Sequence, residues 1–148
     1  MSTAGPVMIR PMRAPDVTDV IAVWAAAGLA TRPAGRDTPA ALRQQLEHYP
    51  RTWLVAEQGG RIVGVVLGTH DGRKGWINRV AVHPDHRRLG LARQLLAACE
   101  AALHAEGIGI VAALVEAHNE ASAAFFRAAG YATDVPVHYF RKLSSPGV

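Results

Sequence analysis

Apolar residues repeat with helical spacing in the first part of the chain. Between Asp16 and Gly28 they recur every three or four positions, as expected of one buried helix face, at Val17, Val20, Ile21 and Trp24. A second helix is predicted to begin at Thr38, a residue type that caps helix N-termini, and Pro39, which is favoured in the first turn. It runs to about Tyr49, so two helices precede the region in which the pattern changes.

From Thr52 onward the apolar positions form short runs separated by turn residues, which is typical of strands. Gly59-Gly60 predicts a two-residue hairpin turn, and Pro84 ends the last run. We therefore expect an antiparallel meander, with strands at 53–56, 62–69 and 76–83 in addition to an opening strand from Val7 to Arg10.

The second half of the chain alternates between helices and strands. A long helix is predicted from Leu89 to Glu106, followed by a nearly uninterrupted apolar run, Ile108 to Val115, as expected of a strand covered on both faces. A further helix is predicted at 119–129. Two last strands are predicted at 131–133 and 137–143, so the whole pattern indicates a mixed sheet with helices on both faces.

The composition fits one globular domain spanning residues 1–148. Hydrophobic residues make up 49% of the 148 positions and charged residues 19%. No apolar run approaches the roughly 18 residues of a membrane span, and the N-terminus lacks an export signal. The one cysteine, Cys99, lies among alanines and is expected to be a packing residue. We expect a cytoplasmic protein without membrane attachment.

The net charge is +4, and the positions of the arginines indicate more about a binding partner than their number does. Four of them gather around one glycine without interleaved aromatic residues, at Arg79, Arg87, Arg88 and Arg93. A surface that binds single-stranded nucleic acid combines positive charge with aromatic stacking platforms. This distribution therefore favours a local anion site over a nucleic-acid track.

The segment from Val80 to Ala92 combines a strand, a turn stopped by proline and a helix start. The first-turn N–H groups of a helix point outward, and the aligned peptide dipoles favour an anion there. Gly90 allows a phosphate to approach the backbone, and Arg87 and Arg88 supply charge-assisted hydrogen bonds. Taken alone, the segment is compatible either with a pyrophosphate site or with an ordinary helix start bearing solvated charges.

Two motifs together resemble the Gcn5-related N-acetyltransferase (GNAT) superfamily. Arg87-Arg88-Leu89-Gly90-Leu91-Ala92 resembles its Arg/Gln-x-x-Gly-x-Gly/Ala signature, and the segment from Asn119 to Tyr131 resembles its second motif. The resemblance implies an α/β fold whose mixed, mostly antiparallel sheet has six to seven strands, helices on both faces, and fourth and fifth strands that splay apart. It also implies that the chain uses acetyl-CoA as acyl donor and requires no metal.

The resemblance further implies which positions bind the coenzyme. The fourth strand would pair through its backbone with the pantetheine arm, and the glycine-containing turn would hold the pyrophosphate. In the second motif, Asn119 would meet the pantetheine arm, and Phe125 and Phe126 would pack near the acetyl-bearing end. The residues that match are Val80, Ala81, Val82, Arg87, Arg88, Leu89, Gly90, Leu91, Ala92, Arg93, Asn119, Phe125 and Phe126.

The familiar acid and base of the family do not transfer to this sequence. Phe126 stands where many relatives have a tyrosine that protonates the leaving thiolate, and Leu114 stands where some have a glutamate base. A neutral amine can attack a thioester directly if the reactants are oriented and the developing oxyanion is stabilised. A backbone N–H near Val82 is a candidate to stabilise the oxyanion. The candidate proton acceptors are Glu116, His118, Asn78 and Tyr139.

The acceptor implied by the resemblance is a small-molecule amine or a protein amino group. Its site would be built by the two N-terminal helices and the loop 31–37. His83 and His86 lack an obvious third ligand nearby, so no metal site is predicted. Homodimers are common on this fold. The alternatives are a non-catalytic CoA-binding or regulatory module on the same fold and a basic nucleic-acid-binding protein.

Overall fold

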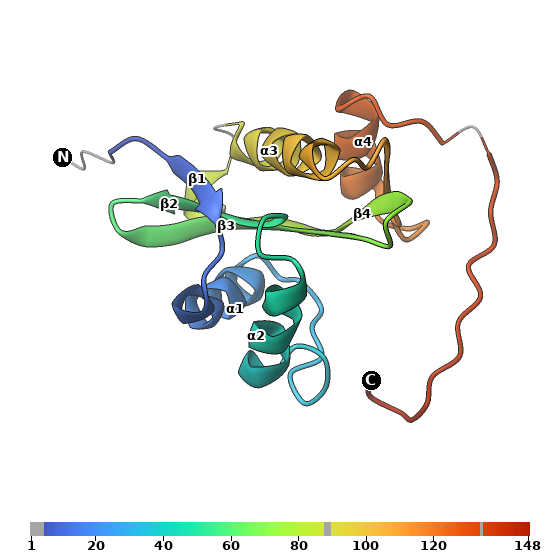
Figure 1. Cartoon of the computed structure of the whole chain (residues 1–148), viewed down its shortest axis with the longest axis horizontal. Coiled ribbons are helices and arrows are strands. Elements are labelled where there is room, and N and C mark those ends of the chain that lie inside the picture. The colour runs from blue at the N-terminus through green and yellow to red at the C-terminus, as the bar shows by residue number, and fades with distance from the viewer. Residues whose placement is uncertain (1–4, 88–89, 134) are drawn as a thin grey trace.

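A central sheet separates two helical layers in the computed structural model of this chain, which describes residues 5–87, 90–133 and 135–148 (Figure 1). Five strands lie in sequence order across the sheet. All neighbours pair antiparallel except the last two, which are parallel. The strands are β1 (Met8–Pro11), β2 (Trp53–Gln58), β3 (Arg61–His70), β4 (Lys74–Val82) and β5 (Ile110–Ala113).

One face of the sheet is covered by α1 (Val17–Ala26), which follows the short 3-10 helix η1 (Ala14–Asp16), and by α2 (Pro39–His48). Two tryptophans, Trp24 on α1 and Trp53 on β2, are almost fully buried in this core. Thr38 caps α2 as expected, since its hydroxyl accepts a hydrogen bond of 3.1 Å from the Ala41 N–H.

The opposite face is covered by α3 (Leu91–Ala105), with α4 (Glu120–Ala128) beside it (Figure 1). The buried side of α3 carries Leu95, Leu96, Cys99 and Leu103, at the spacing of an amphipathic helix. Two hydrophobic cores therefore hold the sheet between the helical layers, and the prediction of helices on both faces is confirmed.

An ion cluster joins β1 to the start of α1. Arg10 donates to both carboxylate oxygens of Asp16, at 2.8 and 3.0 Å, and to Glu57 on β2 at 3.0 Å. These hydrogen bonds lower the pKa of the Asp16 carboxyl, and the same bond to Asp16 is the main cause that raises the pKa of Arg10. The cluster thus fixes where the first helical layer begins against the sheet.

The C-terminal segment differs from the prediction. Residues 131–133 and 137–143 were expected to add two strands, yet neither segment pairs with the sheet, which has five strands rather than six or seven in the described part of the chain. The segment instead extends away from α4 (Figure 1). Consequently β5 lies at the edge of the sheet, and it is shorter and more exposed than the predicted strand at 108–115.

Gly68 on β3 lies where the packed core leaves no room for a side chain. A Cβ at this position would collide with the Cys99 sulfur and lie 3.1 Å from the Thr52 carbonyl oxygen. We expect Gly68→Ala to lower the free energy of unfolding by about 1–3 kcal/mol, because the core is overpacked. Urea denaturation measures the loss. Cys99→Ala should restore part of it in the double variant, whereas strictly additive effects of the two substitutions would contradict this packing.

Candidate coenzyme and acceptor sites

The parallel pairing between β4 and β5 ends before β4 does. Ile77 pairs with Ala113, the last residue of β5, whereas β4 continues to Val82 while still paired with β3 on its other side. Within the described residues, the β5-facing edge of β4 from Asn78 to Val82 has no partner strand. Its backbone groups can therefore pair with an extended, amide-containing ligand.

The chain turns from this edge into the N-terminus of α3. His83 caps the short 3-10 helix η2 (Pro84–His86) by accepting a hydrogen bond of 3.2 Å from the Asp85 N–H. Gly90 then adopts φ 71° and ψ 12°, a left-handed conformation that glycine tolerates best. Apart from its chain neighbours, no atom of the described residues lies within 4 Å of the position its Cβ would take. The first helical bond runs from the Gln94 N–H to the Gly90 carbonyl, so the amides of Leu91 to Arg93 form the open first turn.

The arginines near this turn have different surroundings. Arg87 is exposed, and its guanidinium lies 3.5 Å from the Ala27 carbonyl oxygen. Arg93 is exposed but donates to the Ala128 carbonyl at 3.2 Å, which ties α3 to the end of α4. Arg88 and Leu89, predicted to contact pyrophosphate, lie outside the described residues. Arg79, grouped with them in the sequence, belongs to a different site on the sheet.

A β-bulge turns two consecutive residues of β4 to the same face. Leu67 pairs with Arg79 and the next residue, Gly68, pairs with Ile77, so Asn78 is the extra residue. A bulge breaks the alternation of side chains along a strand. Asn78 and Arg79 accordingly both line a cavity beneath α2, at the point where β4 separates from β5.

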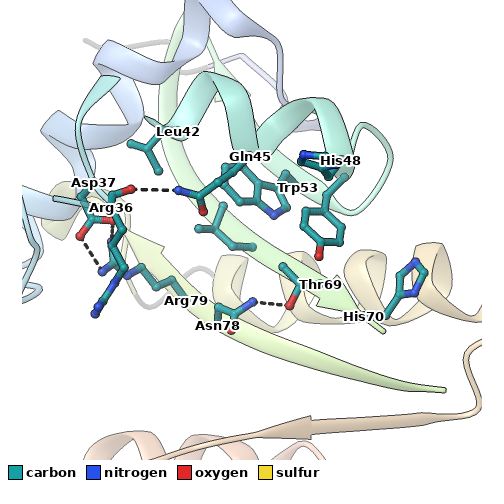
Figure 2. A pocket seen from close by; sticks show the side chains of 12 residues that line it. Arg36, Asp37, Leu42, Gln45, His48, Trp53, Thr69, His70, Asn78 and Arg79 are labelled. Atoms are coloured by element: carbon teal, nitrogen blue, oxygen red, sulfur yellow. Dashed lines mark hydrogen bonds and ion pairs between the residues drawn. The ribbon is translucent and has the colours of Figure 1, made fainter. Parts of the chain in front are cut away.

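This cavity has a volume of about 740 Å³ and lies between α2, the loop before it and the sheet (Figure 2). The Tyr49 ring stacks on Trp53 at 6.4 Å between centroids, which gives the cavity an aromatic side. Asn78 donates to the Thr69 hydroxyl at 2.7 Å. Two histidines, His48 and His70, also line it. Asn78 was already a candidate from the sequence, whereas Thr69, His48 and His70 were missed because they come from separate elements without a shared motif.

A buried ion pair closes one end of the cavity. Arg79 donates to both carboxylate oxygens of Asp37, at 3.2 and 3.1 Å, and the side chains are only 14% and 7% exposed. Asp37 also accepts the Arg32 N–H at 2.6 Å, and the Arg79 guanidinium lies 4.4 Å from the centre of the Trp24 ring. The pair thus fixes the loop before α2 against the sheet.

The second motif forms the start and inner side of α4. Asn119 caps the helix by accepting a hydrogen bond of 3.1 Å from the Ser122 N–H. Phe125 and Phe126 are half-buried, and the Phe126 ring packs edge-on against Tyr131 at 5.1 Å. Tyr131 donates to Glu100 at 2.6 Å, and burial, followed by this bond, raises the pKa of its phenol well above the usual range. Tyr131 therefore stays protonated at neutral pH.

The four proposed proton acceptors do not converge. Glu116 and His118 pair at 3.3 Å on the exposed loop after β5, close to Leu114. Tyr139 lies exposed in the C-terminal segment. Among the four, Asn78 lines the cavity beneath α2, and an amide side chain is no base at neutral pH.

Neither a reactive thiol at Cys99 nor a metal-ligating group at His83 and His86 is found in the described residues. Burial raises the pKa of the Cys99 thiol to about 12, which leaves essentially no thiolate at neutral pH. No group of three potential metal-ligating side chains occurs in residues 5–87, 90–133 and 135–148. Over the same residues, each helix is too short or too polar to cross a bilayer.

Comparisons with known proteins agree with this geometry. The model of the Acetyltransferase (GNAT) family matches residues 21–131. An acetyltransferase of Yersinia pestis (strain Pestoides F) is 33% identical over 135 residues, which cover 91% of this chain and 94% of that protein.

Two solved structures share the fold. An aminoglycoside N-acetyltransferase in complex with CoA superposes with a TM-score of 0.74 at 18% identity, covering 96% of this chain and 99% of that one. A ribosomal-protein-alanine N-acetyltransferase from Brucella melitensis has a TM-score of 0.69 at 19% identity, with 93% and 100% coverage. The predicted α/β architecture is thereby confirmed.

The buried ion pair between Arg79 and Asp37 is expected to stabilise the fold, and substituting Asp37 tests this. We expect Asp37→Asn to lower the free energy of unfolding by about 3 kcal/mol, because it leaves the Arg79 charge buried without its partner. Arg51→Gln is the control, since Arg51 bonds Glu106 at 3.3 Å with 71% of its side chain exposed. That variant should lose less than about 1 kcal/mol. Equal losses in urea denaturation would show that the Asp37 pair is not structural.

Proposed function

Because the chain belongs to the GNAT acetyltransferase family, we propose that it transfers the acetyl group of acetyl-CoA to a primary amine by direct attack in a ternary complex. The observation that carries the proposal is the position of Asn78. This residue lies where the β4 edge loses its β5 partner, and its side chain lines the cavity beneath α2. A coenzyme arm along the edge and an amine in the cavity would therefore meet there.

The residues along β4 and the start of α3 fit the coenzyme. The unpartnered β4 edge at Val80 to Val82 offers backbone groups to the pantetheine amides. The open space above Gly90 and the amides of Leu91 to Arg93 suit a pyrophosphate, which a helix N-terminus attracts. Arg87, which is exposed beside this turn, adds positive charge. An N–H of the same strand edge near Val82 would stabilise negative charge on the thioester oxygen.

The cavity beneath α2 is proposed as the acceptor site. Its carboxylate, Asp37, is already shared by Arg79 and the Arg32 N–H, whereas Arg36 adds a positive charge to the lining. The lining offers little attraction for a polycation. It suits a neutral amine or an amine that carries an anionic group.

The acceptor must lose one proton from its ammonium form before the neutral amine can attack the thioester, and two imidazoles line the cavity. His70 is already engaged, because its Nδ1 accepts the Gly72 N–H at 3.0 Å and its Nε2 lies 3.5 Å from Glu106. This supports His48, or water held beside it, as the proton acceptor. Leaving-group protonation would come from solvent, since Phe126 supplies no hydroxyl.

The proposal is tested by release of free CoA thiol on a panel of amines and peptides at saturating acetyl-CoA. Turnover with one acceptor class supports the function and identifies the substrate type. Calorimetric binding of acetyl-CoA without turnover on any acceptor would support the non-catalytic module instead. Absence of acetyl-CoA binding would overturn the proposal.

Gly90→Glu should weaken acetyl-CoA binding at least tenfold. The substitution places a negative side chain over the pyrophosphate position and opposes the favourable field of the helix N-terminus. Isothermal titration calorimetry measures the change in Kd. Gly107→Glu is the matched control, because Gly107 also has a positive φ of 87° and open space around it but lies at the other end of α3. Unchanged affinity in a folded Gly90→Glu variant would sink the assignment.

Asn78→Ala should lower kcat/KM for the acceptor by about tenfold, while the Kd for acetyl-CoA changes little. Tenfold corresponds to roughly 1.4 kcal/mol of transition-state stabilisation, the expected contribution of one positioned hydrogen-bonding group. Thr69→Val removes the oxygen that orients Asn78 and should show a smaller loss in the same direction. Thr69→Ser keeps that hydroxyl and serves as the control. Normal acceptor kinetics in Asn78→Ala would show that the acceptor binds elsewhere.

A further inference from the structure

The charges that line the cavity beneath α2 do not balance. Two guanidiniums, those of Arg36 and Arg79, line it against a single carboxylate among the described residues, that of Asp37. The two histidines of the lining, His48 and His70, add positive charge whenever they are protonated. The lining therefore presents one positive charge at neutral pH that no anion of the lining compensates.

Arg79 does not carry this uncompensated charge. Its two terminal nitrogens donate to the two carboxylate oxygens of Asp37, at 3.2 and 3.1 Å, and its side chain is only 14% exposed. Its guanidinium also lies against the Trp24 ring, at 4.4 Å from the ring centre. A ligand anion could reach Arg79 only by displacing a buried partner, which is costly. The pair with Asp37 is thus complete in itself.

Arg36 carries the charge that is left, on a backbone that is held in place. Its carbonyl oxygen accepts a hydrogen bond of 3.0 Å from the Gln45 side-chain amide, and the next residue is the buried Asp37 (Figure 2). Its side chain is exposed, and its guanidinium makes no ion pair with a carboxylate in the described part of the chain. Arg36 therefore offers a positioned guanidinium to a ligand in the cavity.

The cavity has one end for an anion and another region for the amine. In Figure 2, Arg36 lies at one end and His48 toward the other, with Asn78 between them. The proposed function places the thioester beside Asn78 and the proton acceptor at His48, so the amine of the acceptor belongs in that region. Leu42 and Leu67 add apolar surface to the lining. A ligand that matches the whole cavity joins an amine to an anion through an apolar spacer.

Resting on the proposed function, we propose that the acceptor is a small primary amine bearing a carboxylate on an apolar spacer, and that Arg36 binds this carboxylate. Arg36 is then the residue that determines acceptor specificity. A planar guanidinium bonds a carboxylate through two parallel N–H groups, and one uncompensated charge matches a carboxylate better than a doubly charged phosphate monoester. The volume of about 740 Å³, closed at this end by the buried ion pair, favours a small molecule over a peptide.

The carboxylate takes no part in the bonds that change. The amine nitrogen bonds the acetyl carbon, the carbon–sulfur bond of acetyl-CoA breaks, and the proton of the ammonium leaves to His48 or to water beside it. The thiolate of CoA then takes a proton from solvent. Arg36 acts by holding the acceptor, so its contribution should appear in the KM for the acceptor rather than in kcat.

The test compares acceptors that differ in the carboxylate alone, at saturating acetyl-CoA and with release of free CoA thiol as the readout. The pairs are β-alanine, γ-aminobutyrate and para-aminomethylbenzoate, each with its own carboxamide. The native chain should acetylate the carboxylate of at least one pair with a kcat/KM about tenfold above that of the carboxamide, because a charge-assisted hydrogen bond is lost in the carboxamide.

Substitution of Arg36 assigns the preference to this residue. Arg36→Gln should bring the ratio of the two kcat/KM values to about one, through a higher KM for the carboxylate. Arg36→Lys keeps the charge without the paired N–H groups and should retain part of the ratio. Arg32→Gln is the matched control, since Arg32 is an exposed arginine of the same loop that does not line the cavity. Its ratio should equal that of the native chain.

The outcomes separate this inference from the proposed function. Turnover with equal kcat/KM for carboxylate and carboxamide in every pair would overturn the inference and leave the acetyl transfer standing. An equal fall of the ratio in Arg36→Gln and Arg32→Gln would also overturn it, because only the general charge of the loop would then matter. Turnover confined to peptides would exclude the small-molecule acceptor. Absence of turnover with every amine would contradict the proposed function itself, and the inference with it.

Discussion

The early end of the parallel pairing between β4 and β5 is the constraint on which the rest of the site depends. β4 is held by β3 over its full length, but β5 accompanies it only as far as Ile77. Beyond that residue the strand keeps its shape and presents a row of unpaired backbone groups. After β4 ends at Val82, the chain passes through η2 and reaches Gly90 and the first turn of α3, whose amides we propose as the pyrophosphate site.

A bulge at the same place links this edge to the other face of the sheet. Without the extra residue, Asn78 and Arg79 would point to opposite faces, whereas with it both line the cavity beneath α2. Arg79 then becomes structural, because it bonds Asp37 and packs on Trp24. Asn78 is left at the junction of the two sites. A single irregularity in the ladder therefore brings the unpaired edge of β4, where we propose that the coenzyme binds, and the cavity that we propose for the amine to one point.

Much of this fold was predictable from local pattern. Local signals predict the start, end or buried face of an element, as do Thr38, Gly59-Gly60 and the apolar spacing along α3. The helices and inner strands lie where these signals indicate. The bulge at Asn78 has no comparable signal, since it depends on the register between two strands. Apart from Asn78, which was a candidate from the sequence, the lining of the cavity was missed for the same reason, because residues such as Tyr49 and His70 reach it only through the tertiary fold. Residues 137–143 were predicted to form a strand, but that segment pairs with no strand among the described residues.

The central claim is that the coenzyme lies along the free edge of β4 and over the start of α3. The most direct measurement is a titration of the isotopically labelled full chain with acetyl-CoA, followed by amide chemical shifts. The account predicts that the largest changes occur at the N–H groups of Val80 to Val82 and Gly90 to Arg93, on both sides of the turn. Shifts confined instead to β5 and α4, with these amides unmoved, would contradict it.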